Sequence, residues 1–209
     1  MQSVALIDYG SGNLRSAEKA LVRAAAGTSQ IIVTSDPDQV AGADRIVLPG
    51  VGAFAACMKA LSERPGLIEA MTQAVQVKGR PFLGVCVGMQ LLATRGLEFG
   101  ETPGLGWIPG DVRRVEPTDP AAKIPHMGWN NIIPVRSDPI LEGIKNNDRF
   151  YFVHSYHVSG IPLENVLAET TYKYSFISVI RKENIWGIQC HPERSHTSGI
   201  TFLSNFLRV

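Results

Sequence analysis

The strongest restriction on the fold comes from the first half of the chain, where short apolar segments alternate with helix-like ones. The apolar segments have the length of buried strands. They lie at 4–7, 30–34, 45–48 and 81–85. Helices are predicted at 14–26, from the Asp36-Pro37 cap onward, at 53–60, 67–77 and 87–93. Strands separated by helices predict a parallel sheet with helices on both faces.

The second half is rich in predicted strands, punctuated by turns. These strands lie at 111–115, 131–135, 149–158, 166–171, 175–181 and 185–189, and a helix at 198–207 follows. Residues 182–184 are predicted to form a hairpin turn between the last two strands. The chain has no repeats and no long linker. We therefore expect one α/β domain over 1–209, with a mixed, mostly parallel central sheet flanked by helices.

Charge and composition exclude several classes of protein. The chain has 209 residues with 20 Lys and Arg against 19 Asp and Glu, a net charge of +1. This balance does not favour binding to nucleic acid or to a membrane surface. No apolar run approaches the roughly 20 residues of a membrane helix, and the start does not resemble a secretory signal. Three widely spaced cysteines fit reduced thiols in a cytoplasmic protein better than disulfides or zinc ligands.

Two patterns that suggest a cofactor or metal are weak. The Gly10-Ser11-Gly12 turn lacks the third glycine of a dinucleotide-binding loop, because Arg15 stands there. His154 and His157 are three apart on one predicted strand, so they would point to opposite faces. We expect no cofactor and no metal.

A Gly-x-Cys-x-Gly pattern at 84–88 marks Cys86 as a candidate nucleophile. It lies where a predicted strand meets a predicted helix, as in the nucleophile elbow of hydrolases. Such a turn needs glycine neighbours, and the helix start offers free N–H groups that favour a thiolate. The alternative is a small buried core cysteine.

A thiolate nucleophile requires a base, and five histidines are available. His191 follows an apolar strand and stands two residues before Glu193. In an extended chain these two side chains share a face, so Glu193 can orient the imidazole. Cys190 should then point to the opposite face and serve packing. The alternative for His191 is a surface turn histidine beside a solvated glutamate.

Together, residues 84–90 and His191-Pro192-Glu193 resemble the class I, or triad, glutamine amidotransferases, over essentially the whole chain. More closely, the sequence is similar to the glutaminase subunits of imidazole glycerol phosphate synthase. Four segments carry that finer resemblance: Asp8-Tyr9-Gly10-Ser11-Gly12-Asn13-Leu14, Pro49-Gly50-Val51-Gly52-Ala53-Phe54, His126-Met127-Gly128-Trp129-Asn130 and Phe152-Val153-His154-Ser155-Tyr156. The resemblance implies a flavodoxin-like arrangement of the sheet.

The resemblance also implies roles for individual residues. Cys86 would attack the side-chain amide of glutamine, His191 would act as acid and then base, and Glu193 would orient His191. The oxyanion hole would be formed by Val51, Gly52 and Val87. Glutamine would be bound by Gly50, Gln90, Glu98, Ser155 and Tyr156.

The same resemblance implies a heterodimer with a (βα)8-barrel cyclase subunit, to which ammonia would pass. Asn13, Trp129 and Arg194 are candidates for the surface that meets this partner. Alternative readings are a glutaminase subunit of another amidotransferase, an unrelated cysteine hydrolase, and a binding module without catalysis. Two departures from the family pattern lie close to the site: Cys190 where phenylalanine is usual, and Arg194 where lysine is common.

Overall fold

The computed structural model describes residues 1–10, 12–117 and 121–209, so Ser11 of the predicted turn at 8–13 lies outside the described residues. Within the described part, the largest sheet has eight strands in the order β2-β1-β3-β4-β14-β13-β12-β9. The first five strands of this order, β2-β1-β3-β4-β14, are parallel to one another. The pairings β14-β13, β13-β12 and β12-β9 are antiparallel. Their bounds are β1 Gln2–Ile7, β2 Ser29–Thr34, β3 Arg45–Gly50, β4 Phe82–Cys86, β9 Ile133–Pro134, β12 Val166–Thr171, β13 Ser175–Lys182 and β14 Ile185–Ile188. The predicted mixed, mostly parallel sheet is confirmed.

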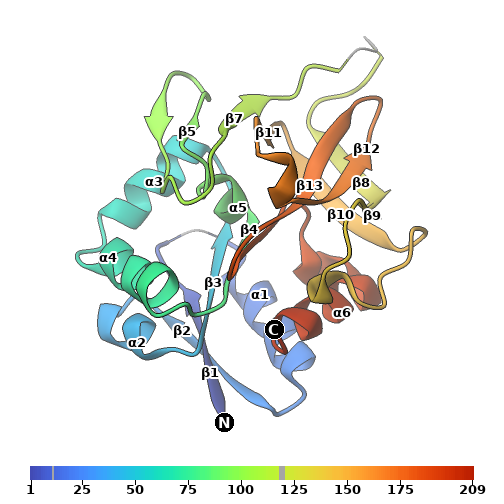
Figure 1. The fold of residues 1–209 in the computed structure, drawn as a ribbon. Coiled ribbons are helices and arrows are strands. Elements are labelled where there is room, and N and C mark those ends of the chain that lie inside the picture. Colours follow the sequence, from blue (N-terminus) through green and yellow to red (C-terminus); the bar gives the residue numbers. More distant parts are fainter. Residues whose placement is uncertain (11, 118–120) are drawn as a thin grey trace.

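Helices cover both faces of this sheet (Figure 1). Helices α1 and α6 pack against each other, whereas α2, α3 and α4 form the opposite layer. Their bounds are α1 Leu14–Ala25, α2 Pro37–Gly42, α3 Phe54–Ser62, α4 Leu67–Thr72 with a π-helical extension Gln73–Val77, α5 Val87–Gln90 and α6 His196–Phe206. The Asp36 cap is confirmed, because its side chain accepts a hydrogen bond from the Asp38 N–H.

The described residues also form two smaller sheets, one at the right of the view in Figure 1, beside β12 and β9, and one at the top. One pairs β8 with β10, and the other has the order β11-β7-β5-β6. Their bounds are β5 Arg95–Gly96, β6 Thr102–Pro103, β7 Asp111–Arg114, β8 His126–Asn131, β10 Arg149–His154 and β11 Tyr156–Ser159. Short 3-10 turns occupy Pro139–Leu141, Leu163–Asn165 and Pro192–Arg194.

Three predicted elements differ from the structure. The predicted strand at 149–158 is split at Ser155, because β10 pairs with β8 while β11 pairs with β7 in another sheet. The predicted strand at 131–135 is shortened to β9 at Ile133–Pro134, and β8 at His126–Asn131 was not predicted, because Gly128 and two asparagines have weak strand preference. The predicted helix at 87–93 keeps only the short α5, and irregular turns follow it.

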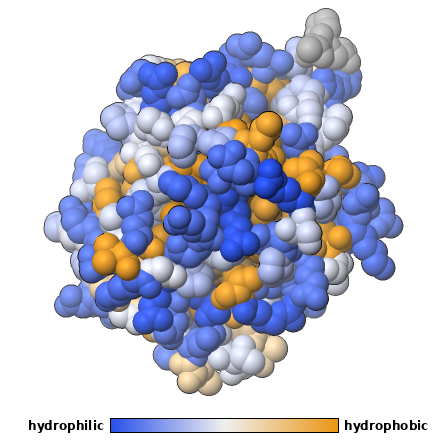
Figure 2. Space-filling model, in the orientation of Figure 1, coloured by the Kyte–Doolittle hydropathy of each residue, from blue (hydrophilic) through white to orange (hydrophobic). Residues whose placement is uncertain are grey.

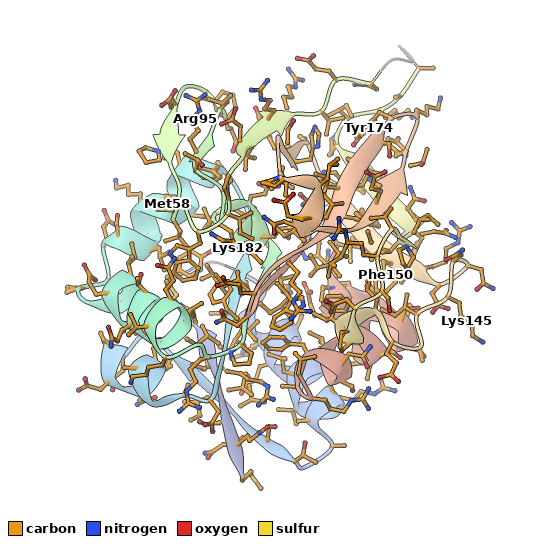
Figure 3. All side chains as sticks on the ribbon, viewed as in Figure 1. Met58, Arg95, Lys145, Phe150, Tyr174 and Lys182 are labelled. Atoms are coloured by element: carbon orange, nitrogen blue, oxygen red, sulfur yellow. The ribbon has the colours of Figure 1, made fainter. Side chains whose placement is uncertain are left out.

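The interior is filled by apolar side chains from the sheet and the inner helix faces. Phe150, labelled in Figure 3, is one of several fully buried aromatic residues. On the face drawn in Figure 2, hydrophobic residues lie in small groups among hydrophilic ones. Among the described residues, no helix is long and apolar enough to span a bilayer.

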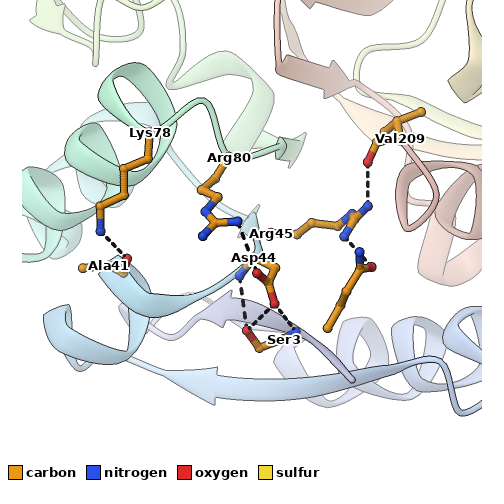
Figure 4. A network of polar contacts seen from close by, with 8 residues as sticks. Ser3, Ala41, Asp44, Arg45, Lys78, Arg80 and Val209 are labelled. Atoms are coloured by element: carbon orange, nitrogen blue, oxygen red, sulfur yellow. Dashed lines mark hydrogen bonds and ion pairs between the residues drawn. The ribbon is translucent and has the colours of Figure 1, made fainter.

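A polar network joins the two ends of the chain at the N-terminal edge of the parallel strands (Figure 4). The Arg45 guanidinium donates to the Val209 carbonyl and to Gln2 Oε1, both at 2.6 Å. Asp44 accepts hydrogen bonds from the backbone and hydroxyl of Ser3. The C-terminal ends of these strands lie at the opposite edge of the sheet.

Candidate active site

The central strand order explains why residues far apart in sequence meet. Strands β3, β4 and β14 are parallel neighbours, and their C-terminal ends lie at one edge of the sheet. Gly50 at the end of β3 is in register with Cys86 at the end of β4. His191 follows β14 by three residues. This is the edge at which open α/β sheets bind ligands.

Cys86 lies at a strained junction between β4 and α5. Its φ is 55° and its ψ is −112°, and it is 3 % exposed. The flanking glycines are required sterically: a Cβ on Gly84 would lie 2.5 Å from the Gly88 carbonyl oxygen, and a Cβ on Gly88 would lie 1.9 Å from that of Leu48. The predicted elbow is therefore present. Because α5 is a single turn, stabilisation of a thiolate there depends on the free N–H groups at its start rather than on a helix dipole.

His191 lies between Cys86 and Glu193. Its Nδ1 is 2.8 Å from Glu193 Oε1, and its other nitrogen is left for the hydrogen bond that it shares with Cys86. Burial opposes a charged imidazole, yet the pKa of His191 is raised to about 10, because Cys86 and Glu193 both favour the imidazolium. The arrangement can therefore hold a proton on His191 next to the sulfur.

Asn13 adds a contact that the sequence analysis did not contain. It precedes α1 with a left-handed φ of 74°, and its Nδ2 donates to Glu193 Oε1 at 2.6 Å. The carboxylate thus receives hydrogen bonds from both His191 and Asn13. Two donors on one oxygen restrict the orientation of the acidic group.

A cavity of about 230 Å³ opens in front of Cys86. It is lined by Val51, Gly52, Cys86, Val87, Gln90, Glu98, Val153, His154, Ser155, Tyr156 and His191. These include all the predicted oxyanion-hole residues and all but one of the predicted glutamine-binding residues. Gly50 lines a smaller cavity behind His191 instead, together with Asn13 and Glu193. The structure therefore brings most of the predicted site residues around one space.

The polar groups of this cavity suit an amino acid. Glu98 supplies a negative charge, and its Oε2 accepts a hydrogen bond from the Phe54 N–H. The Nε2 of Gln90 donates to the Tyr156 carbonyl and to Gln189 Oε1, both at 3.0 Å. The Oε1 atom of Gln90 can then accept a hydrogen bond from a ligand. A carboxylate and an amide oxygen can together hold an ammonium group.

The loop after β3 has a backbone conformation that favours glycine. Gly52 has a φ of 102°, and the Val51 carbonyl is 3.4 Å from the Cys57 sulfur. The Val87 N–H begins α5, where helix N–H groups have no partner within the helix. The Val87 N–H is therefore a backbone donor next to the nucleophile, and Val51 and Gly52 line the same cavity.

The residues predicted to meet a partner lie on one side of the triad. Trp129 is 43 % exposed and stacks on His196 with ring centroids 5.0 Å apart. The Arg194 guanidinium lies 5.5 Å from the centre of the Tyr151 ring. Arg194, His196 and Glu193 also line a shallow pocket with one face of α1.

Two further predictions about neighbouring residues have clear outcomes. Cys190 is fully buried, and burial raises the pKa of its thiol well above the usual value, so its predicted packing role is confirmed. His154 and His157 do not share a strand, because β10 ends at His154 and β11 contains His157. No group of three His, Cys, Asp or Glu side chains in the described part of the chain could hold a metal ion.

The sequence analysis missed Gln189. Its Nε2 is 3.7 Å from the Cys86 sulfur, and its side chain is fully buried. The sequence signal for it is weak, because its two partners, Gln90 and Cys86, lie about a hundred residues away along the chain.

Comparison with known proteins agrees with this geometry. The model of the family "Glutamine amidotransferase class-I" matches residues 5–209, and the chain belongs to that family. It is 54 % identical to "Imidazole glycerol phosphate synthase subunit HisH" of Caulobacter vibrioides, over 99 % of this chain and 98 % of that protein. It is 51 % identical to the protein of the same name in Ruegeria pomeroyi, over 97 % of each. A solved structure described as a glutamine amidotransferase shares the fold, with a TM-score of 0.74, 18 % identity and coverage of 98 % and 97 %.

Proposed function

We propose that this chain hydrolyses L-glutamine to glutamate and ammonia, and that the ammonia serves imidazole glycerol phosphate synthesis in histidine biosynthesis. The position of His191 between Cys86 and Glu193, at the wall of a cavity that contains Glu98, carries the proposal. The full-length relatives named as subunits of imidazole glycerol phosphate synthase support the pathway.

In the first half-reaction, the Cys86 thiolate attacks the carbonyl carbon of the side-chain amide. The oxyanion that forms is stabilised by backbone N–H groups of Val87 and of the Val51-Gly52 segment. The protonated His191 then donates its proton to the departing nitrogen, which leaves as ammonia. The product on the enzyme is a glutamyl thioester on Cys86.

In the second half-reaction, neutral His191 removes a proton from a water molecule, which attacks the thioester carbonyl. The second oxyanion collapses, the carbon–sulfur bond breaks, and glutamate leaves. Glu193 keeps the imidazole oriented throughout, with Asn13 holding the carboxylate. Glu98 and Gln90 hold the substrate ammonium, while the backbone near Ser155 and Tyr156 meets its carboxylate.

The proposed partner is a (βα)8-barrel cyclase subunit, in a heterodimer located in the cytoplasm. The exposed aromatic and cationic surface formed by Trp129, Tyr151, Arg194 and His196 is the proposed contact area. It lies beside Glu193 and Asn13, so docking there would bring the partner close to where ammonia is released.

Replacement of the nucleophile tests this division of labour. In a complex with the cyclase subunit, Cys86→Ala should abolish glutamine-dependent synthesis of imidazole glycerol phosphate and spare synthesis from added ammonium salt. The wild-type complex, assayed with glutamine and with ammonium salt, is the reference for both activities. Loss of both activities in a correctly folded complex would contradict the proposal.

A further inference from the structure

A continuous chain of hydrogen bonds leads away from the Cys86 sulfur through buried side chains. Its first link is the Gln189 amide, whose Nε2 lies 3.7 Å from the sulfur, within the longer range of hydrogen bonds to sulfur. Its second link is Gln90, whose Nε2 donates to Gln189 Oε1 at 3.0 Å. Because Gln90 donates to the oxygen of Gln189, the N–H of Gln189 must face Cys86.

The Tyr156 carbonyl fixes the direction of the next links. It accepts hydrogen bonds from Gln90 Nε2 and from His154 Nδ1, each at 3.0 Å. A carbonyl oxygen can only accept, so His154 carries its proton on Nδ1. The Nε2 of a neutral His154 is then an acceptor, and it lies 3.0 Å from His126 Nδ1.

Burial keeps both histidines neutral, as this directionality requires. It lowers the pKa of His154 to about 3 and the pKa of His126 to about 4. Neutral His126, which donates through Nδ1, presents its Nε2 as an acceptor to Asn130 Nδ2 at 3.5 Å. Asn130 is anchored by a second hydrogen bond, to the Thr171 carbonyl at 2.9 Å.

Two runs of donors therefore converge on the Tyr156 carbonyl, and one of them begins on β8, the strand that also presents Trp129 to solvent. The other run starts at Gln90, which also donates to Gln189, and it ends on the Cys86 sulfur. A change in the position of β8 would alter the hydrogen bonds to the Tyr156 carbonyl. It would in turn alter how Gln90 and Gln189 face the sulfur.

We propose that Gln189 is a positioning residue for the hydrolysis of glutamine, with its amide held against the Cys86 sulfur by a relay through Asn130, His126, His154, the Tyr156 carbonyl and Gln90. This inference rests on the proposed function and adds a polar connection between the Trp129 strand and the nucleophile. The Gln189 donor stabilises the thiolate and restricts the side chain of Cys86.

Gln189→Met is the first test, because methionine fills a similar volume without a donor. In the complex, kcat for glutamate release should fall about tenfold while KM changes less than about twofold, as expected for loss of a hydrogen bond to a charged atom. Alkylation of Cys86 by iodoacetamide, followed by mass spectrometry of the Cys86 peptide, should slow by a similar factor. Unchanged kcat and alkylation in Gln189→Met would overturn the proposal.

A pair of His154 variants tests the part of the relay that is distant from Cys86. These variants also keep the proposal testable if Gln189→Met does not fold. His154→Phe removes the donor to the Tyr156 carbonyl and should slow Cys86 alkylation several-fold. His154→Asn can place an amide N–H where Nδ1 was, and should restore most of the rate. Equal rates for the two variants would show that His154 only fills space, which contradicts the relay.

Tyr174→Phe is the matched control. Tyr174, labelled in Figure 3, packs against Phe176, which also contacts His154, and the Tyr174 hydroxyl has no hydrogen-bond partner within the described residues. Removal of this hydroxyl should leave kcat for glutamate release and the rate of Cys86 alkylation at the wild-type values. If Tyr174→Phe lowered them as much as the relay variants do, the relay would not be specific. If the wild-type complex releases no glutamate, the proposed function fails, whereas the alkylation rates still test the relay.

Discussion

The side-chain amide of Asn13 donates a 2.6 Å hydrogen bond to Glu193 Oε1, across most of the length of the chain. It joins the start of α1 to the acidic member of the triad. Because Asn13 lies beside the proposed partner surface, a partner that contacts α1 would act directly on the group that orients His191.

Removal of this amide should weaken catalysis more than stability. The informative variant is Asn13→Gly, because glycine accepts the left-handed φ of 74° without strain. We expect kcat for glutamate release to fall about tenfold, since the orienting carboxylate loses a charge-assisted hydrogen bond. Asn13→Asp should reduce it further, because two carboxylates would then face each other. An Asn13→Gly enzyme with wild-type kcat would show that the contact is dispensable.

The raised pKa of His191 predicts a specific dependence of stability on pH. An unfolded imidazole has a pKa of about 6.5, whereas His191 in the folded chain has a pKa of about 10. The folded state therefore binds this proton more tightly, and the resulting stabilisation is complete below the unfolded pKa and lost as pH rises through the folded pKa. Burial lowers the pKa values of His126 and His154, so these two residues reduce stability as pH falls below the pKa of an unfolded histidine.

Urea unfolding of the wild type and of His191→Asn, from about pH 6 to about pH 10.5, measures this contribution. The wild type should lose stability relative to His191→Asn as pH rises through that range. The same dependence in both chains would mean that His191 is not protonated in the folded state.

The close approach of Gly88 to β3 predicts a large effect of one methyl group. In Gly88→Ala, the Cβ would meet the Leu48 carbonyl oxygen at 1.9 Å. We expect a loss of about 3 kcal/mol of unfolding free energy, together with loss of activity as the elbow shifts. Gly42→Ala is the control, because its Cβ would meet nothing within 4 Å and should slightly stabilise α2. Similar unfolding midpoints for the two variants would contradict the steric argument.

The network at the opposite edge of the sheet should affect stability without affecting chemistry. Arg45 is 6 % exposed, and Arg45→Ala leaves the carbonyls of Phe206 and Val209 without this donor. We expect a loss of about 1–3 kcal/mol with kcat unchanged. In Lys78→Ala, an exposed hydrogen bond to Ala41 is lost, and stability should change by less than about 0.5 kcal/mol. A fall in kcat for Arg45→Ala would show coupling between the two edges.

The sequence was sufficient for elements whose signals are local. The strands of the parallel half and the elbow around Cys86 follow from apolar runs and glycine spacing. The contact between His191 and Glu193 was predicted from the alternation of an extended chain, whereas in the structure the 3-10 turn at Pro192–Arg194 brings the two side chains together. Strand β8 was missed because Gly128 and its asparagines carry weak strand preference, and pairing with β10 supplies the missing stabilisation.

The contacts that sequence analysis could not provide join residues that are distant along the chain. Asn13 meets Glu193, and Gln189 meets both Gln90 and Cys86, only because the parallel strands end at a common edge. The break at Ser155 is equally non-local, since it depends on β11 leaving β10 to pair with β7. No pattern within a short window encodes these relationships.

The most direct test of the proposed activity is the rate of glutamate release from glutamine by the purified chain, alone and with a (βα)8-barrel cyclase subunit and its ribonucleotide ligand. We expect slow turnover alone, strong stimulation by the liganded partner, and none in Cys86→Ala. Steady turnover that the partner does not change would assign the chain to another pathway, and an absence of glutamate under every condition would contradict the catalytic triad.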